Sequence, residues 1–209
     1  VYKRQTLEFR GTVADINAAL NGLQYDPNLN YNNSNTSPFT PDVLTLTIND
    51  LGNFGAGVAI TDTTTVDVTV TADNDAPVNE LDGASIVGTP LIQALEHRPT
   101  EPSVIFDGSG ANNPLLSVSD VDVDEATVNT GVLSVTLTAT SGTITLAQTT
   151  GLTFTPVDPS NDGVDDATLT FSGTVANINA ALNGLAFNLL PGFFTNGVGP
   201  FASLQIVTS

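Results

Sequence analysis

Apolar and polar residues alternate with a period of two along most of the chain, a pattern typical of half-buried β-strands. In the first third the clearest alternation covers residues 43–48 and 64–70. Later in the chain it predicts further strands at residues 114–119, 132–140, 142–147, 151–155, 167–172, 185–189 and 202–207. Gly or Pro marks the turns between them, and Ser141-Gly142 predicts a tight hairpin. Many short strands with regular turn signals favour an all-β fold, an antiparallel sandwich.

One twenty-residue segment occurs twice. Residues 6–25 read TLEFRGTVADINAALNGLQY and residues 168–187 read TLTFSGTVANINAALNGLAF, so fifteen of the twenty positions are identical at a spacing of 162. Each copy predicts a short strand, a short helix and a second strand, and in the first copy Thr12 can cap the helix while Gly22 can end it. So short a helix must pack on a sheet to persist. The duplication therefore predicts β-rich repeats with one short helix inserted in each.

The chain is expected to contain parts of two repeats. The string Asp73-Asn74-Asp75-Ala76-Pro77-Val78 ends the strand at residues 64–70, and Pro77 cannot continue a β-ladder. We therefore expect residues 6–75 to be the C-terminal part of one β-sandwich repeat and residues 76–209 to be the next repeat, truncated before its closing strand. Residues 1–5 resemble translated adapter sequence at the ends of metagenomic contigs. Because the chain also lacks Met, we expect a fragment and leave these five residues out of the fold argument.

The charge of the chain excludes several classes of partner. There are 22 Asp and Glu against 4 Lys and Arg, a net charge of −18. A nucleic-acid binder needs a cationic surface, and none can be assembled from Arg10 and Arg98. Anionic membranes would repel the chain, and no apolar stretch approaches the ~18 residues of a membrane-spanning helix, so we expect no membrane insertion. Cys is absent, which excludes disulfides and thiol chemistry. So acidic a chain favours bound cations.

Catalysis finds little support in the sequence. His97 is the only His and lies in the polar string Glu96-His97-Arg98-Pro99, whereas a Ser-His-Asp arrangement needs a His beside a nucleophile. Paired carboxylates could serve glycoside hydrolysis, but sugar clefts usually carry aromatic platforms and the chain has no Trp. Phenylalanines fall mostly on apolar alternation and are expected in the core: Phe9, Phe154, Phe171 and Phe187. We expect no enzymatic activity.

Several strings resemble a known family. Asp73-Asn74-Asp75-Ala76-Pro77-Val78 is similar to the linker between cadherin and cadherin-like repeats, and Ser119-Asp120-Val121-Asp122 resembles their Asp-x-Asp loop. With the string Gly-Leu-Thr-Phe-Thr at residues 151–155 and the duplicated helix segment, the chain resembles the tandem repeats of giant bacterial surface and type I-secreted adhesins. The helix segment also resembles the chondroitin-sulfate-proteoglycan-type repeat. The resemblance covers nearly all of residues 6–209.

The family resemblance implies a cadherin-like or immunoglobulin-like sandwich, head-to-tail chaining, and Ca²⁺ at the junctions between repeats. It implies linker ligands from Asp73, Asn74 and Asp75, which Asp120 and Asp122 of the next repeat would join. Glu101 would serve the following junction, although Pro102 replaces the usual Asp there. The mid-domain Asp-Arg-Glu of vertebrate cadherins has no clear match. The plainer interpretation is that Asp and Asn form turns beside a Pro.

A second acidic loop spans Asp158-Pro159-Ser160-Asn161-Asp162-Gly163-Val164-Asp165-Asp166. It resembles nine-residue calcium loops, which makes Asp158, Asp162 and Asp166 candidate ligands. Leu169 stands where an EF-hand needs its acidic twelfth residue. Asn161-Asp162-Gly163 also suits an ordinary hairpin tip.

A third acidic pattern follows the predicted strand at residues 114–119. Asp120, Asp122 and Asp124 alternate, so in an extended chain they would share one face. The plainer interpretation is an acidic edge exposed to solvent, which would also keep an edge strand from pairing with neighbours.

The expected function is a Ca²⁺-stiffened structural spacer in a large extracellular bacterial adhesin. Its partners would be neighbouring repeats of the same chain and, through the parent adhesin, a host or matrix glycan or protein. Two alternatives stay open: a carbohydrate- or protein-binding module that uses loops 26–41 or 190–200, and a non-catalytic domain of a secreted enzyme. The near-identical copies favour the spacer, because tandem repeats build length.

Overall fold

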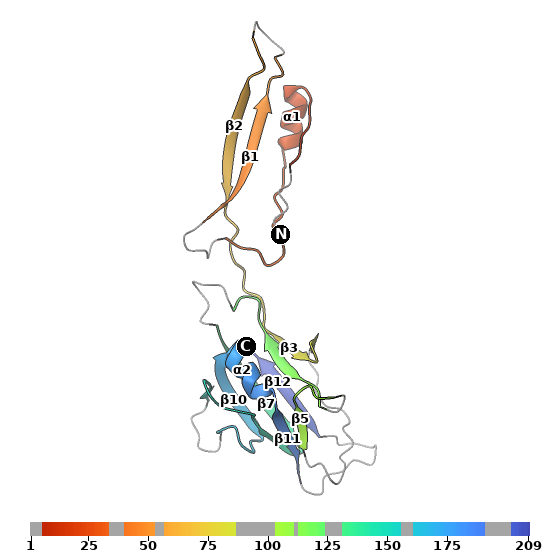
Figure 1. Ribbon diagram of the computed structural model, residues 1–209, viewed down its shortest axis with the longest axis vertical. Helices are drawn as coiled ribbons and strands as arrows, with labels where there is room; N and C mark the ends of the chain where they lie inside the picture. The colour runs from red at the N-terminus through yellow and green to blue at the C-terminus, as the bar shows by residue number, and fades with distance from the viewer. Residues whose placement is uncertain are drawn as a thin grey trace. The chain divides into compact units, whose positions relative to one another are not determined.

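The computed structural model describes residues 6–33, 40–52, 57–86, 103–110, 113–123, 131–155, 161–190 and 202–209. The described chain is mostly β, with antiparallel sheets and two short helices (Figure 1). It divides into two compact units between Ala72 and Asp73. We call residues 6–33 with 40–72 unit 1, and the described residues from 73 to 209 unit 2. The sequence had suggested the nearby division between residues 75 and 76.

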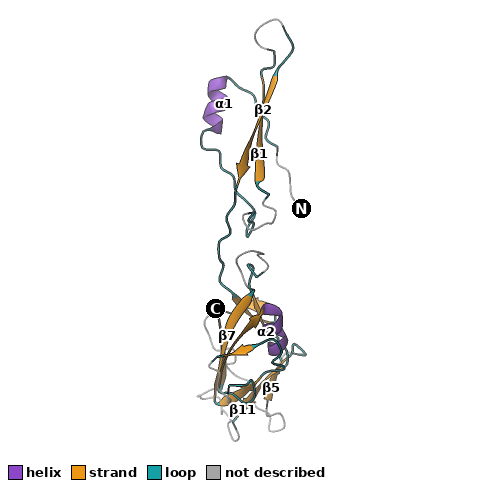
Figure 2. Cartoon of the chain, turned by 90° about the vertical axis from the view of Figure 1, so that its left-hand side faces the viewer, coloured by secondary structure: helices purple, strands orange, loops and turns teal. Residues whose placement is uncertain are grey.

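Unit 1 combines helix α1 (Val13–Leu20) with a hairpin of β1 (Asp42–Asn49) and β2 (Thr61–Val68). Thr12 caps the helix, because its hydroxyl oxygen accepts the Asp15 N–H at 3.2 Å and its hydroxyl donates to the Asp15 carboxylate at 2.7 Å. The helix lies beside the hairpin in Figures 1 and 2, yet none of its residues is buried. Unit 1 therefore forms its expected helix without the burial on a sheet that the sequence predicts, and its described residues have no closed core.

Polar side chains secure the base of the unit 1 hairpin. The buried Asn33 side chain donates to the Val68 carbonyl at 3.0 Å and accepts the Val70 N–H at 2.8 Å, so its amide imitates a neighbouring strand. The Tyr31 hydroxyl donates to the Asp42 carboxylate at 2.8 Å, and the Tyr25 hydroxyl donates to the same carboxylate. These bonds tie the segment before β1 to the hairpin without apolar burial.

Unit 2 contains three antiparallel sheets. The largest has the order β12-β7-β10-β9, from Ser203–Thr208, Val132–Thr140, Thr168–Thr174 and Thr153–Phe154. The second has the order β5-β11-β8, from Ser103–Phe106, Leu185–Leu189 and Gly142–Thr145. The third has the order β4-β3-β6, from Ala84–Ser85, Val78–Leu81 and Leu116–Ser119. Helix α2 (Val175–Leu182) connects β10 to β11 and so joins two of the sheets.

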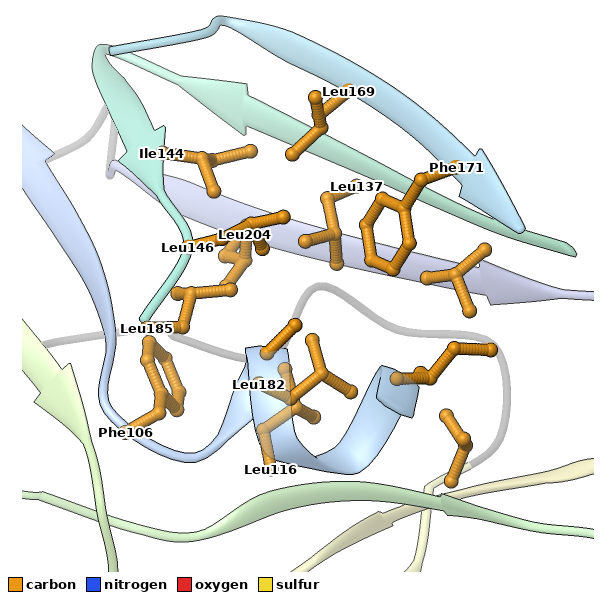
Figure 3. Close-up of a cluster of buried hydrophobic side chains, with 14 of the residues drawn as sticks. Phe106, Leu116, Leu137, Ile144, Leu146, Leu169, Phe171, Leu182, Leu185 and Leu204 are labelled. Carbon is orange, nitrogen blue, oxygen red and sulfur yellow. The ribbon is translucent and has the colours of Figure 1, made fainter. Parts of the chain in front are cut away.

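The core of unit 2 is built around α2 (Figure 3). Ile178, Ala181 and Leu182 on one face of the helix are fully buried, as the i, i+3, i+4 pattern predicts. They belong to one cluster with strand residues that include Phe106, Leu116, Leu137, Ile144, Leu169, Phe171, Leu185 and Leu204. Phe171 stands opposite Val135 on one side and Phe154 on the other, with the two Phe ring centroids 6.1 Å apart. In unit 2 the expected packing of the short helix is confirmed.

The predicted hairpin at Ser141-Gly142 is wrong. Strands β7 and β8 lie in different sheets, and the chain passes from one to the other at Ser141, whose φ is 60°. A Cβ on Gly142 would lie 2.6 Å from the ring of Phe187, so the corner needs a residue without a side chain. Periodicity identified both strands but carried no information about their pairing.

The strands expected in the first copy are also wrong. Residues 6–9 and 23–25 have no strand structure, and Phe9, expected in the core, is 41% exposed. Their counterparts in unit 2 form β10 and β11, because partner strands lie on both sides of each. The alternation pattern also did not predict strands β3, β4 and β5.

Candidate functional site

The acidic segment 73–75 meets the turn that follows β6. The Asp75 N–H donates to the Asp122 carboxylate at 2.5 Å, and the Asp122 N–H donates to Asp120 Oδ1 at 2.9 Å. Asp122 is 5% exposed, whereas Asp75 is open to solvent. Two hydrogen bonds therefore connect three of the five residues expected at this site, in the order Asp75, Asp122 and Asp120.

Strand pairing explains why the two acidic strings meet. Strand β3 pairs antiparallel with β6, and Val78 stands opposite Ser119. Residues just before β3 must therefore lie beside residues just after β6. The meeting follows from a strand that the alternation pattern did not predict.

The other two linker residues, Asp73 and Asn74, make no hydrogen bond to the turn after β6 in the described part of the chain. Asp73 and Asn74 are both exposed, and the Asn74 side-chain amide donates only to the neighbouring Asp75 carbonyl, at 3.3 Å. Among the described residues no group of three or more acidic, His or Cys side chains is arranged to hold a metal ion. The calcium site at this position stays a prediction.

The structure tests the expected alternation only at Asp120 and Asp122, which do not lie in an extended segment. Residues 121–123 form a turn, which buries Asp122 and leaves Val121 55% exposed. The turn arises because the Asp120 side chain accepts the N–H two residues on, a common preference of Asp. His97, Glu101 and Asp124 lie outside the described residues.

In the second acidic loop, two Asp side chains accept hydrogen bonds from backbone N–H groups of the same loop. Asp166 is 5% exposed and accepts the Gly163 N–H at 2.9 Å, while exposed Asp162 accepts the Val164 N–H at 3.0 Å. The Asp166 backbone also exchanges two hydrogen bonds with Ile144, at 2.7 and 3.0 Å. Asp158 lies outside the described residues. The structure thus brings Asp162 and Asp166 into one loop.

Burial raises the pKa of Asp166 above its ordinary value, because the carboxylate loses water. Repulsion from the Asp162 and Asp165 carboxylates acts in the same direction, and the Gly163 N–H opposes it. A cation bound here would favour the ionised form. The ionised form of the Asp166 carboxyl is therefore disfavoured in this loop.

Asp165 is a residue that sequence reasoning missed. Its Oδ1 accepts the Asn188 side-chain amide at 3.1 Å and the hydroxyls of Thr143 and Thr145 at 3.3 Å each. It therefore ties the loop to β8 and β11. The calcium-loop pattern assigned it no role, and the only usable signal was its place in an acidic pair beside the next strand.

Together these features define a class: a mostly-β chain in which two units contain copies of one twenty-residue segment that forms a short helix in both. No protein-family model matches the chain, and comparisons with curated proteins and with solved structures also give no match. Within the described residues, no helix combines the length and apolar character needed to cross a lipid bilayer.

Proposed function

We propose that this chain is a non-catalytic spacer segment of a large extracellular bacterial adhesin, made of cadherin-like β-sandwich repeats that Ca²⁺ stiffens. The observation that carries the proposal is the 2.5 Å contact between the Asp75 N–H and the Asp122 carboxylate. It joins the linker-like acidic string to the Asp-x-Asp loop, two strings 47 residues apart in sequence. The duplicated segment supports the repeat character of the proposal.

Calcium would act at the start of unit 2. Ca²⁺ takes six to eight oxygen ligands from carboxylates, amides and carbonyls. The exposed side chains of Asp73, Asn74 and Asp75 carry such oxygens, and the Asp75 backbone lies against the Asp122 carboxylate. The bound ion would draw the exposed carboxylates onto the turn after β6 and hold the acidic segment against unit 2.

The overall charge favours this role for a cation. With a net charge of −18, every carboxylate is repelled by many others, and a divalent ion relieves that repulsion where it binds. Without Cys, covalent cross-links cannot supply the stiffness. A bound ion would supply such a constraint for the acidic segment.

Calorimetric Ca²⁺ titration of the full chain tests the proposal. We expect heat of binding, and a melting temperature for unit 2 that is higher with Ca²⁺ than with chelator. Asp122→Asn should weaken Ca²⁺ binding about tenfold or more, since affinity follows ligand charge. Asp67→Asn on β2 makes the same charge change elsewhere and should leave binding unchanged. Absence of both heat and melting shift would refute the calcium role.

A further inference from the structure

The same side chains are exposed in unit 1 and buried in unit 2. In unit 1, Leu7 is 78% exposed, Val13 76% and Leu23 54%. Their counterparts at a spacing of 162 are Leu169 and Leu185, both 0% exposed, and Val175, which packs partly buried against the core. The helices have matching bounds and matching Thr caps in the two copies. The difference in exposure therefore comes from the partners of the segment and not from its own sequence.

Unit 2 shows which partners cover the segment. Strand β7 pairs with β10, so that Leu137 stands opposite Leu169, and β5 and β8 flank β11. The Asn179 side chain of α2 donates to the Val118 carbonyl at 2.9 Å and accepts the Val118 N–H at 2.8 Å. All of these partners lie within residues 103–154. In unit 1 the equivalent Asn17 is exposed, and its side chain makes no hydrogen bond within the described residues.

Strand β1 of the unit 1 hairpin also lacks a partner that its counterpart in unit 2 has, so one of its edges is open among the described strands. At a spacing of 162, β1 falls on residues 204–211, so β12 is its counterpart. Strand β12 pairs with β7, whereas β1 pairs only with β2 among the described strands. The exposed face of β1 includes Leu44, Leu46 and Ile48, at 39%, 37% and 49%. One strand of the β7 type would therefore pair with β1 and residues 6–12 together.

We propose that residues 6–25 and the free edge of β1 form a docking surface for a β-rich segment with the sequence pattern of residues 103–154, supplied by a repeat that precedes residue 6. The β7-like strand lies between residues 6–12 and β1, the β5- and β8-like strands flank residues 23–27, and a β6-like strand pairs with the Asn17 amide. This surface does not depend on calcium.

The two copies differ at Tyr25 and Asp42 of unit 1. The difference is compatible with the proposed pairing, in which a β7-like strand lies beside β1. Tyr25 and Asp42 of unit 1 correspond to Phe187 and Leu204, which are both buried. The Tyr25 hydroxyl donates to the Asp42 carboxylate, so a polar pair replaces two apolar side chains. A carboxylate that already has hydroxyl donors can be covered at a smaller cost than a bare one.

A fused chain tests the proposal. A second copy of residues 76–167 is placed directly before Thr6, which recreates the native join between residues 167 and 168 because residue 6 corresponds to residue 168. Amide hydrogen exchange is then followed in residues 6–25 and 42–49. We expect exchange to slow on the order of a hundredfold or more, towards the rate of residues 168–187, because exchange needs local opening of the new core.

Two controls separate specific docking from a general effect. A fused copy that carries Val135→Asp and Leu137→Asp should leave residues 6–25 unprotected, because both side chains are fully buried in unit 2. Asn17→Ala should accelerate exchange about tenfold in the fused chain and have no effect in the unfused chain.

Residues 168–187 of the same molecule serve as the internal standard of a folded copy. If they stay protected while residues 6–25 exchange freely in the fused chain, the proposal is overturned. Protection of residues 6–25 in the unfused chain that grows with protein concentration would also overturn it, because the occupant would then be a second copy of this chain.

Discussion

At the scale of single residues, two asparagine side chains make the hydrogen bonds to strand backbone that a neighbouring strand would otherwise make. Asn33 bonds to the backbone at Val68 and Val70, and Asn179 bonds both backbone groups of Val118. A carboxamide offers N–H donors and a carbonyl acceptor at about the spacing of a peptide group, so it can satisfy a strand edge. Both asparagines stand where a helix or loop meets a strand that has no neighbour on that side.

Asn179→Ala should lower the free energy of unfolding of unit 2 by about 1–3 kcal/mol, because it leaves the part-buried Val118 backbone groups without a partner. Urea unfolding of the full chain measures the loss. Asn17→Ala is the matched control, since Asn17 is exposed and should change stability by less than about 0.5 kcal/mol. Equal losses from the two substitutions would mean that the amide acts within the helix and not across to β6.

Asp166 should make unit 2 sensitive to pH. Its pKa is raised by burial first, then by repulsion from Asp162 and Asp165, so the folded state binds a proton more readily than the unfolded state. Its contribution to stability is therefore present below the usual Asp range, about pH 4, and is lost as pH rises through the raised pKa.

Asp166→Asn should consequently be more stable than the parent chain at neutral pH in chelator, and the advantage should vanish towards acid pH. The Asn oxygen can still accept the Gly163 N–H. Thermal melts over a pH series test this expectation. A variant less stable than the parent at every pH would show that the ionised carboxylate is needed in the loop.

At the scale of elements, the helix is encoded locally and the strand before it is not. Both copies form the helix over the same eight positions, with Thr at the N-cap. Capping and i, i+4 contacts lie within the segment itself. The strand needs partners for its hydrogen bonds, and in the described part of the chain β10 has them while residues 6–12 do not.

Gly173→Ala tests how closely β10 packs. An added Cβ would lie 2.8 Å from Leu152 Cδ2 and 3.1 Å from the Gly151 carbonyl oxygen, so we expect a loss of about 1–3 kcal/mol in unfolding free energy. The equivalent Gly11 has no atom closer than 3.4 Å, which is ordinary contact. Gly11→Ala should therefore be neutral within about 0.5 kcal/mol in the same chemical denaturation assay.

At the scale of the whole chain, the two units should differ in stability despite their shared segment. Unit 2 has a core of fully buried side chains, whereas the shared segment and hairpin of unit 1 expose theirs. Burial of apolar area is the main favourable term in folding, so unit 1 has little to offset the entropy of ordering its chain.

We expect amides in residues 168–187 to be strongly protected from hydrogen exchange and amides in residues 6–12 to exchange near the rate of an unfolded chain. Mass spectrometry on peptides from the two segments measures this directly. Similar protection in both copies would show that unit 1 closes its own core. A sharp cooperative melt of unit 1 would lead to the same conclusion.

Much of the fold could be predicted from periodicity, though not its pairing. Residues 132–140 and 185–189 were predicted with the bounds that β7 and β11 have, because both alternate and have Gly or Pro close to each end. Strand β3 was missed, since Val78-Asn79-Glu80-Leu81 has too little alternation. Of the candidate site, the acidic strings could be found by composition, but their contact depends on the β3–β6 ladder.

The sequence by itself determined the helix, its cap, the turn positions and the alternation of most strands, because those depend on interactions between residues a few positions apart. Only the tertiary structure decided whether residues of the shared segment lie in a core, that Ser141-Gly142 forms a corner between sheets, and that Asp75 meets Asp122. Burial and strand pairing join residues far apart in the chain. For that reason the shared segment forms two strands and a helix that pack in the core of unit 2, whereas in unit 1 it forms only the helix and stays exposed.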